Sequence, residues 1–153
     1  TSVEGGYGRT GSRSPMQWNG GRNAGFSDAG TDKLYIPLDP DANRPNAEAQ
    51  MSDSDSLRSE VKKLISIRMA HPALQSRGDI RFAYYGKESY PLAYVRTAGD
   101  EKILVVLNPS DKKTEFSFDG EAAEVLYSFG GEAALSGGKV TAQPVSACFI
   151  KLK

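Results

Sequence analysis

The chain has 153 residues, enough for one domain or for one domain with an appendage. Its 19 Lys and Arg residues balance 19 Asp and Glu residues, so the formal net charge is zero. Nucleic-acid and anionic-membrane partners require a clustered basic excess, so we expect neither as the main partner. A complete (β/α)8 barrel needs roughly 250 residues, so this chain cannot contain one.

Residue types that bind metals or form disulfides are scarce. One cysteine, Cys148, and one histidine, His71, exclude an internal disulfide, a cysteine-based zinc site and a multi-histidine metal centre. We therefore expect no metal and no cofactor. We also expect no signal segment and no membrane helix, because the longest mostly apolar run, 103–107, is far shorter than the roughly 20 residues required. The cysteine count leaves the cellular compartment open.

The first third of the chain is rich in residues that interrupt regular structure. Eight of the 16 glycines lie within residues 1–30, and four of the eight prolines lie within the first 45 residues. We predict an irregular loop over 1–52, with one short strand at 34–36. A stretch of this length without regular structure is uncommon in a compact domain, and it indicates a functional loop or missing context.

A helix is predicted over 54–70. Four apolar residues recur there at helical spacing and form one stripe: Leu57, Val61, Leu64 and Ile65. Asp53 or Ser54 is the expected N-cap, and the His71-Pro72 step is expected to end the helix. Arg68 falls inside the stripe, so its side chain either extends outward to water or is buried beside a carboxylate from another element.

After residue 78 the pattern changes to the alternation typical of strands. Turn residues separate candidate strands at 80–84, 92–96, 102–108, 114–119, 123–127, 139–142 and 147–152. Short strands at this spacing, without intervening helices, predict an antiparallel β-sandwich or a small barrel.

Several motifs have simple structural explanations. A G-x-G-x-x-G match at 6–11 lacks the preceding strand and following helix that a dinucleotide site requires. Acid pairs at Asp39/Asp41 and Asp53/Asp55 lack the spacing of a calcium loop, and turn formation and helix capping explain them better. His71 and Cys148 lie in unrelated elements, so we do not expect them to act as base and nucleophile.

The most informative segment is Arg13-Ser14-Pro15-Met16-Gln17-Trp18-Asn19, followed by a second polar and aromatic stretch at 23–27. The segment combines a rigid proline, a forked guanidinium, amides and the chain's single tryptophan. This set suits a ligand with many hydroxyl groups, because aromatic faces cover sugar C–H surfaces and Arg or amides bind oxygens. A loop packed by its own Trp and Phe side chains is the alternative.

The same segment resembles the R-[ST]-P-M-Q-W-[DNS] signature of the alpha-amylase family, glycoside hydrolase family 13, in its alpha-glucosidase, oligo-1,6-glucosidase and trehalose-synthase branch. Further similar stretches lie at 23–27, 34–37, 45–50, 55–57, 63–68, 71–74, 92–96, 104–108 and 149–152. Asn19 stands where many relatives have Asp, and Ser14 where many have Thr, which leaves the subfamily open.

The resemblance implies a position within a larger enzyme. Residues 1–75 would form the end of a catalytic barrel, namely the loop after strand 8 and helix 8 at about 54–70. Residues 78–153 would form a C-terminal all-β domain, so the expected fold is mainly β, an antiparallel β-sandwich of the amylase C-terminal type. The family's catalytic carboxylates would lie before Thr1, so no catalytic residue is expected in this chain. Arg13 matches the arginine that helps hold the non-reducing glucose, and it is the expected substrate-binding residue.

The leading hypothesis is the C-terminal portion of a retaining alpha-glucan-active glycosidase or transglycosidase, inactive as an isolated chain. Its partners would be an alpha-glucoside substrate and the barrel of the same protein. One alternative is a stand-alone carbohydrate-binding module, with candidate tyrosines at Tyr84, Tyr85, Tyr90 and Tyr94. Another is a structural interaction domain with an exposed apolar patch along the stripe from Leu57 to Ile65.

Overall fold

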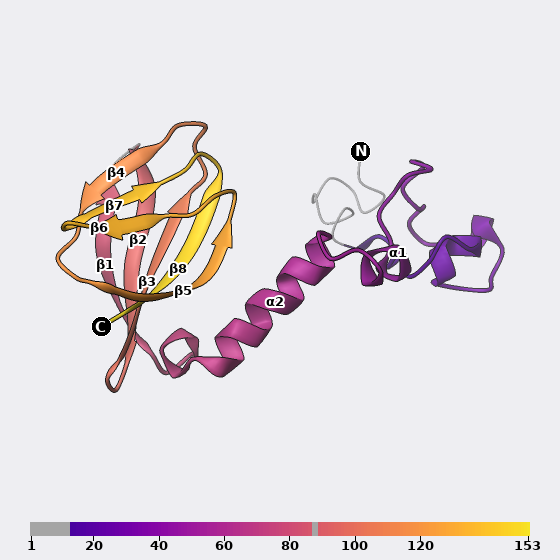
Figure 1. Ribbon diagram of the computed structural model, residues 1–153. Helices are drawn as coiled ribbons and strands as arrows, with labels where there is room; N and C mark the ends of the chain where they lie inside the picture. Colours follow the sequence, from indigo (N-terminus) through magenta and orange to yellow (C-terminus); the bar gives the residue numbers. More distant parts are fainter. Residues whose placement is uncertain (1–12, 87–88) are drawn as a thin grey trace. The chain divides into compact units, whose positions relative to one another are not determined.

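The computed structural model describes residues 13–86 and 89–153 (Figure 1). The chain divides into two compact units, Thr1–Lys63 and Leu64–Lys153, and the division falls within the helix α2 (Leu57–Ala70). No helix in the described ranges is long and apolar enough to cross a membrane.

The described part of the first unit is mostly irregular, as predicted, but it contains short helices that the sequence did not indicate. They are η2 (Arg22–Gly25), η3 (Thr31–Lys33) and α1 (Ala47–Met51). The strand predicted at 34–36 is wrong, because this segment pairs with no other strand. Of its three apolar residues, Ile36 is buried at 5% exposure, whereas Tyr35 is 68% exposed.

Helix α2 begins three residues later than predicted. Ser56 is its N-cap: the Ser56 side-chain oxygen accepts a bond from the Ser59 amide at 3.3 Å, and the Ser56 carbonyl accepts one from the Glu60 amide at 3.0 Å. Asp53, one of the two predicted caps, instead accepts a bond from the Asp55 amide at 2.9 Å and forms a turn before the helix. The other, Ser54, lies in that turn.

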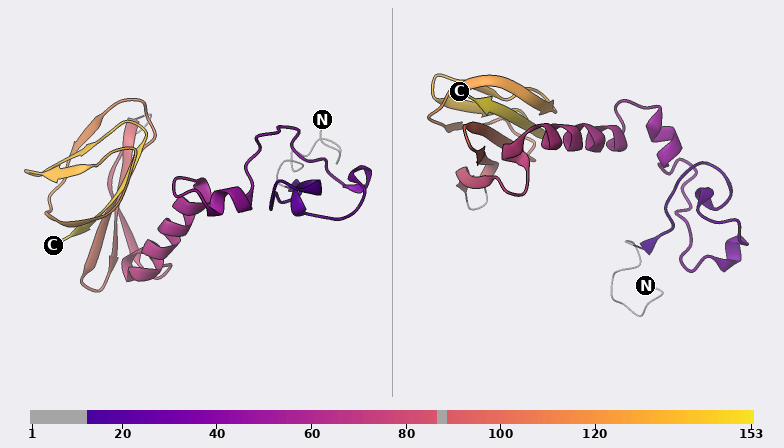
Figure 2. Two further views of the ribbon diagram at one scale, coloured as in Figure 1. Left: turned by 45° about the vertical axis from the view of Figure 1, so that its right-hand side comes forward. Right: turned by 90° about the horizontal axis from the view of Figure 1, so that it is seen from below.

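The second unit is an antiparallel β-sandwich, which confirms the predicted mainly β fold (Figures 1 and 2). Its strands are β1 (Asp79–Gly86), β2 (Ser89–Ala98), β3 (Glu101–Asn108), β4 (Thr114–Ser117), β5 (Ala122–Phe129), β6 (Ala134–Ser136), β7 (Lys139–Ala142) and β8 (Ser146–Leu152). The large sheet has the order β1-β2-β3-β8-β5, and the small sheet has the order β4-β7-β6. The prediction missed β6, which is three residues long.

Between the two sheets lies the main core. Its large-sheet side includes Leu104, Val106 and Ile150, and its small-sheet side includes Phe116 and Val140. The opposite face of the large sheet carries a second apolar cluster, in which Ala73 and Leu74 of η4 (Pro72–Leu74) pack against Ile103 and Val105. Both faces of the large sheet are therefore apolar.

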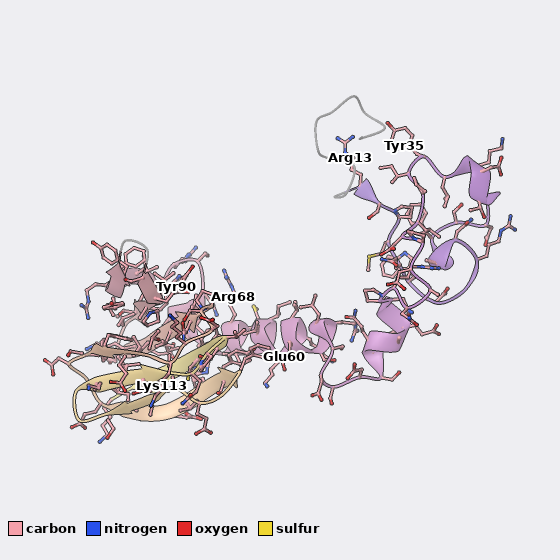
Figure 3. The ribbon with its side chains drawn as sticks, turned by 90° about the horizontal axis from the view of Figure 1, so that it is seen from above. Arg13, Tyr35, Glu60, Arg68, Tyr90 and Lys113 are labelled. Atoms are coloured by element: carbon pink, nitrogen blue, oxygen red, sulfur yellow. The ribbon has the colours of Figure 1, made fainter. Side chains whose placement is uncertain are left out.

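Arg68 is exposed, so of the two arrangements considered the outward one is observed. Figure 3 shows its side chain near the end of α2. It borders a pocket of about 230 Å³ that Tyr94, Arg96 and Phe149 also line. Its guanidinium therefore needs no buried carboxylate.

Candidate functional site

The segment that begins at Arg13 is fixed by the first turn of α1. The amides of Ala47 and Glu48 donate to the carbonyl oxygens of Gln17 and Trp18, each at 2.9 Å. The first amides of any helix have no partner within the helix, so an external acceptor stabilises this end. Asn46 caps the same turn by accepting a bond from the Ala49 amide at 2.9 Å. Helix α1 and the segment therefore hold each other in place.

A left-handed turn closes the segment on its C-terminal side. The Ala24 carbonyl accepts bonds from the Trp18 and Asn19 amides at 2.8 and 3.1 Å. This return requires positive φ at Asn23, Ala24 and Gly25, with values of 49°, 56° and 70°. The φ of 70° favours glycine at position 25, and a Cβ there would lie 2.6 Å from the Asn19 side-chain nitrogen, so an added side chain would also displace Asn19.

Asn23 stabilises the turn from inside. It is 5% exposed, and its side-chain nitrogen donates to the carbonyls of Ser27 and Ala29 at 2.7 and 2.9 Å. Its side-chain oxygen accepts a bond from the Thr31 hydroxyl at 3.2 Å. One buried amide therefore organises the 23–31 loop, which explains the second polar stretch of the sequence without a ligand.

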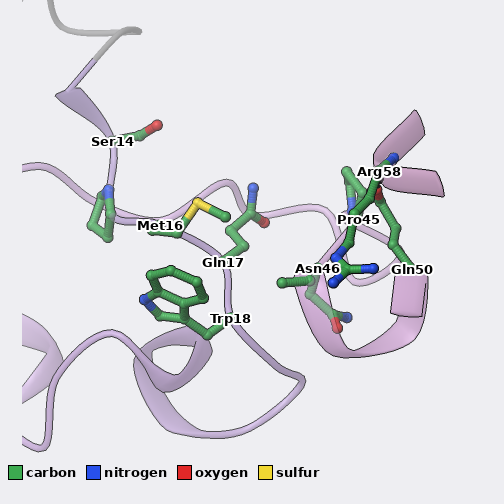
Figure 4. Close-up of a pocket in the computed structure, with 10 residues that line it drawn as sticks. Ser14, Met16, Gln17, Trp18, Pro45, Asn46, Gln50 and Arg58 are labelled. Atoms are coloured by element: carbon green, nitrogen blue, oxygen red, sulfur yellow. Dashed lines mark hydrogen bonds between the residues drawn. The ribbon is translucent and has the colours of Figure 1, made fainter. Parts of the chain in front are cut away.

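A cleft of about 410 Å³ lies between the Arg13 segment and α1 (Figure 4). Met16, Gln17 and Trp18 line one side, and Asn46, Gln50 and Arg58 line the other. Gln50 is fixed because its side-chain oxygen accepts a bond from the Arg58 amide at 2.9 Å. The cleft thus combines an aromatic face, amides and one cation.

Two apolar side chains of the cleft are about half exposed to solvent. Met16 is 49% exposed and Trp18 is 52% exposed. The side-chain oxygen of Gln17 is buried and accepts no hydrogen bond from the described residues. An unsatisfied buried acceptor costs roughly 1–3 kcal/mol. Trp18 and Phe26 are each about half exposed, so a loop packed by its own Trp and Phe accounts for only part of their surface.

Arg13 precedes the cleft and is not among its lining residues. It is exposed, and Figure 3 shows its guanidinium at the start of the described chain. The structure brings together Gln17 and Trp18 of the predicted segment with three residues that sequence reasoning missed, namely Asn46, Gln50 and Arg58. Asn46 as a cap before Ala47-Glu48-Ala49-Gln50 was the available signal.

The Asp39/Asp41 pair has the turn-forming role that was expected. The Asp39 and Asp41 side chains accept bonds from the amides of Asp41 and Asn43, at 2.9 and 2.8 Å, and so form turns. Within 13–86 and 89–153, no three His, Cys, Asp or Glu residues form a group that could bind a metal ion. The G-x-G-x-x-G match at 6–11 lies outside the described residues.

His71 and Cys148 have separate structural roles. The Nδ1 atom of His71 lies 2.7 Å from a Glu101 carboxylate oxygen, and the other oxygen accepts a bond from the Ala73 amide at 2.9 Å. Burial by itself would raise the pKa of Glu101, but the bonds from Ala73 and His71 outweigh it and lower that pKa. Burial raises the pKa of the free Cys148 thiol, so it is a poor nucleophile.

The four tyrosines proposed for carbohydrate binding do not share a surface. Tyr84 stacks on Phe116 inside the sandwich, with ring centroids 5.1 Å apart. Tyr94 packs on the opposite face of the large sheet. Tyr85 and Tyr90 are exposed. A flat binding row made of all four tyrosines is therefore excluded.

Two protein-family models match the chain in succession. The alpha-amylase catalytic domain matches residues 1–77, and the maltogenic amylase C-terminal domain matches residues 80–144. Glucan 1,6-alpha-glucosidase of Streptococcus pneumoniae serotype 4 is 32% identical over 119 residues, which are 78% of this chain and 21% of that protein. Trehalose synthase/amylase TreS of Mycobacterium tuberculosis is 39% identical over 109 residues, which are 67% of this chain and 18% of that protein.

A solved structure agrees with these matches. The trehalulose synthase MutB of Pseudomonas mesoacidophila MX-45 is 30% identical, with a TM-score of 0.78 over 95% of this chain and 26% of that one. The chain spans about a fifth of the length of the curated relatives it matches. The chain belongs to the alpha-amylase family, glycoside hydrolase family 13.

Proposed function

We propose that this chain is the C-terminal part of a retaining alpha-glucan-active glycosidase or transglycosidase. Residues 1–75 complete the catalytic barrel, and residues 78–153 form a domain that stabilises it. The observation that carries the proposal is the order of the two family matches, with the catalytic-domain match ending at residue 77 and the C-terminal-domain match beginning at residue 80. The named relatives are alpha-glucosidases and trehalose synthases, which supports an alpha-glucoside as substrate.

The exposed apolar surface of α2 supports a role in barrel closure. None of its residues is buried, and Leu57, Val61 and Ile65 are 74%, 45% and 56% exposed. A stable helix in a globular protein buries its apolar stripe against another element. We infer that the preceding part of the catalytic domain covers this stripe.

Arg13 is the proposed substrate-binding residue. Its guanidinium can donate two parallel bonds to neighbouring sugar hydroxyls or pair with a carboxylate beside them. The exposed position of Arg13 beside a cleft with an aromatic wall supports this role. Catalysis itself needs two carboxylates about 5–5.5 Å apart on a rigid frame, and we assign those to the preceding part of the protein.

Arg13→Ala tests the binding role in a longer form of the protein, expressed with the coding sequence upstream of Thr1 and called the long form below. Loss of a charged hydrogen bond of about 1.5–3 kcal/mol lowers kcat/KM for an aryl alpha-glucoside roughly 10- to 150-fold. Arg22→Ala is the matched control, because Arg22 is also exposed and does not line the cleft. Equal kcat/KM values for the two variants would contradict the assignment.

A further inference from the structure

In the second unit, the central part of the large sheet is buried on both faces, whereas an isolated sandwich needs to bury only the face toward the other sheet. Antiparallel sheets with one wet face alternate buried and exposed residues along each strand. Strand β3 instead has four consecutive residues that are no more than 1% exposed, Ile103, Leu104, Val105 and Val106. This continuous burial is typical of a strand that is covered on both faces.

The outer face of the large sheet is the face opposite the main core. Residues matched by the catalytic-domain model cover part of this outer face. Ala73 and Leu74 of η4 pack on Ile103 and Val105, and Ile67 of α2 joins the same cluster. All of these residues belong to one compact unit. An interface between catalytic-domain residues and the outer face of the sheet therefore exists within this chain.

Away from η4 the cover ends, but the apolar surface continues. A cross-strand row runs from Leu92 through Leu107 and Ala147 to Phe129. This row forms the base of a groove of about 410 Å³, called the outer groove, which Tyr90 and Val145 also line. Phe129 and Val145 are 51% and 58% exposed.

The outer groove lacks the polar groups that a sugar would need. Tyr90, which is exposed, brings a single hydroxyl to its rim, and the other two polar side chains that border it are buried and already bonded. Asn108 donates to the carbonyls of Lys112 and Gln143 at 2.8 and 2.7 Å, and Ser146 donates to the Gln143 carbonyl at 2.6 Å. The groove therefore fits an apolar protein surface better than a hydroxylated ligand.

Val145 adds a second observation. It has a φ of 44° and is held there by a bond from its amide to the Ser110 carbonyl at 2.8 Å. A β-branched residue in this conformation is a genuine outlier, and such strain clusters at functional surfaces. Here the strained residue presents an exposed isopropyl group at the outer groove.

We propose that the preceding part of the catalytic domain docks in the outer groove and so extends the interface that α2 and η4 already form on the same sheet. The inference rests on the proposed function, and it assigns the surface through which the β-domain stabilises the barrel. The occupant is expected to insert apolar side chains between Phe129 and Val145.

Cysteine labelling tests this docking in both the isolated chain and the long form. Phe129→Cys and Val145→Cys place a thiol in the outer groove, and Ala134→Cys places one on the exposed surface of β6 in the small sheet. The native Cys148 is 0% exposed and serves as an internal unreactive thiol. Peptide mass spectrometry measures the labelling rate at each position.

In the isolated chain the three introduced thiols should react at similar rates. In the long form, positions 129 and 145 should react roughly tenfold or more slowly, because water is excluded from a packed interface, while position 134 is unchanged. Unchanged rates at 129 and 145 in the long form would overturn the proposal. So would protection in the isolated chain that grows with concentration, which indicates a second copy. Turnover of an aryl alpha-glucoside by the long form tests the proposed function separately.

Discussion

At the scale of single residues, the backbone is most constrained at residues with a positive φ. Asn23 and Gly25 are residue types that tolerate this region, and bonds from the Asn23 side chain offset its cost. Val145 has no such advantage, because its branched Cβ crowds the backbone. The expected cost is about 1–3 kcal/mol for a residue held in this region.

Val145→Asn should therefore raise the free energy of unfolding of the isolated second unit by about 1 kcal/mol, because Asn tolerates a positive φ. Thermal unfolding measures this as a rise in Tm of roughly 4–8 °C for a domain of this size. Val125→Asn is the control, since Val125 is similarly exposed at 46% but lies in β5. There the exchange should lower Tm, because Asn is disfavoured in strands. A fall in Tm for both variants would count against strain at Val145.

The start of α2 illustrates what sequence resolves at this scale. Asp53, Ser54 and Ser56 are all residue types that cap helices. The choice among them depends on which side chain meets a free helix amide, and here it is Ser56 with Ser59. A pattern of residue types predicts that a cap exists, but the backbone path decides which residue provides it.

At the scale of elements, the connection between α2 and the sheet is fixed by side chains that bind backbone. Glu101 at the start of β3 binds the Ala73 amide and His71. Arg96 in β2 donates to the carbonyls of Ala73, Gln75 and Gly78 at 3.1, 2.6 and 3.0 Å. The 71–78 connection is therefore held from two adjacent strands.

The Glu101 contact should make stability depend on pH in the acid range. The folded-state pKa lies below the usual value of 4.5, so the contribution is complete above 4.5 and is lost as pH falls through the lower value. Glu101→Gln should lower the free energy of unfolding by roughly 1–3 kcal/mol at pH 7. Denaturant unfolding should show this difference shrinking as the pH falls below 4.5.

The exposed Glu132→Gln variant controls for the loss of one charge, because no described contact joins Glu132 to the connection. A difference between Glu101→Gln and the native chain that stays constant from pH 7 to about pH 3 would contradict the role of the carboxylate.

Elements with a long periodic pattern were predictable from the sequence. Alternation of apolar and polar residues located seven of the eight described strands, and helical spacing located α2. Helix α1 has five residues and β6 has three, so neither repeats a pattern often enough to be recognised. The cleft was not predictable, because backbone bonds between Gln17, Trp18 and the first turn of α1 create it. Arg13 was singled out through the family signature.

At the scale of the whole molecule, both units expose large apolar side chains to solvent. In the first unit this surface includes Met16 and Trp18 beside the cleft, and in the second it includes Phe129 and Val145 at the outer groove. Helix α2, which spans the division between the units, has no buried residue. We propose one explanation for all three surfaces: each is covered or enclosed when the preceding part of a catalytic barrel is present.

The most direct test of that account is the turnover of an aryl alpha-glucoside by the isolated chain and by the long form, each purified to a single species. We predict turnover by the long form and none above the buffer rate by the isolated chain, because we assign the catalytic carboxylates to the preceding part of the protein. Turnover that follows the isolated chain through successive chromatography steps would contradict the account.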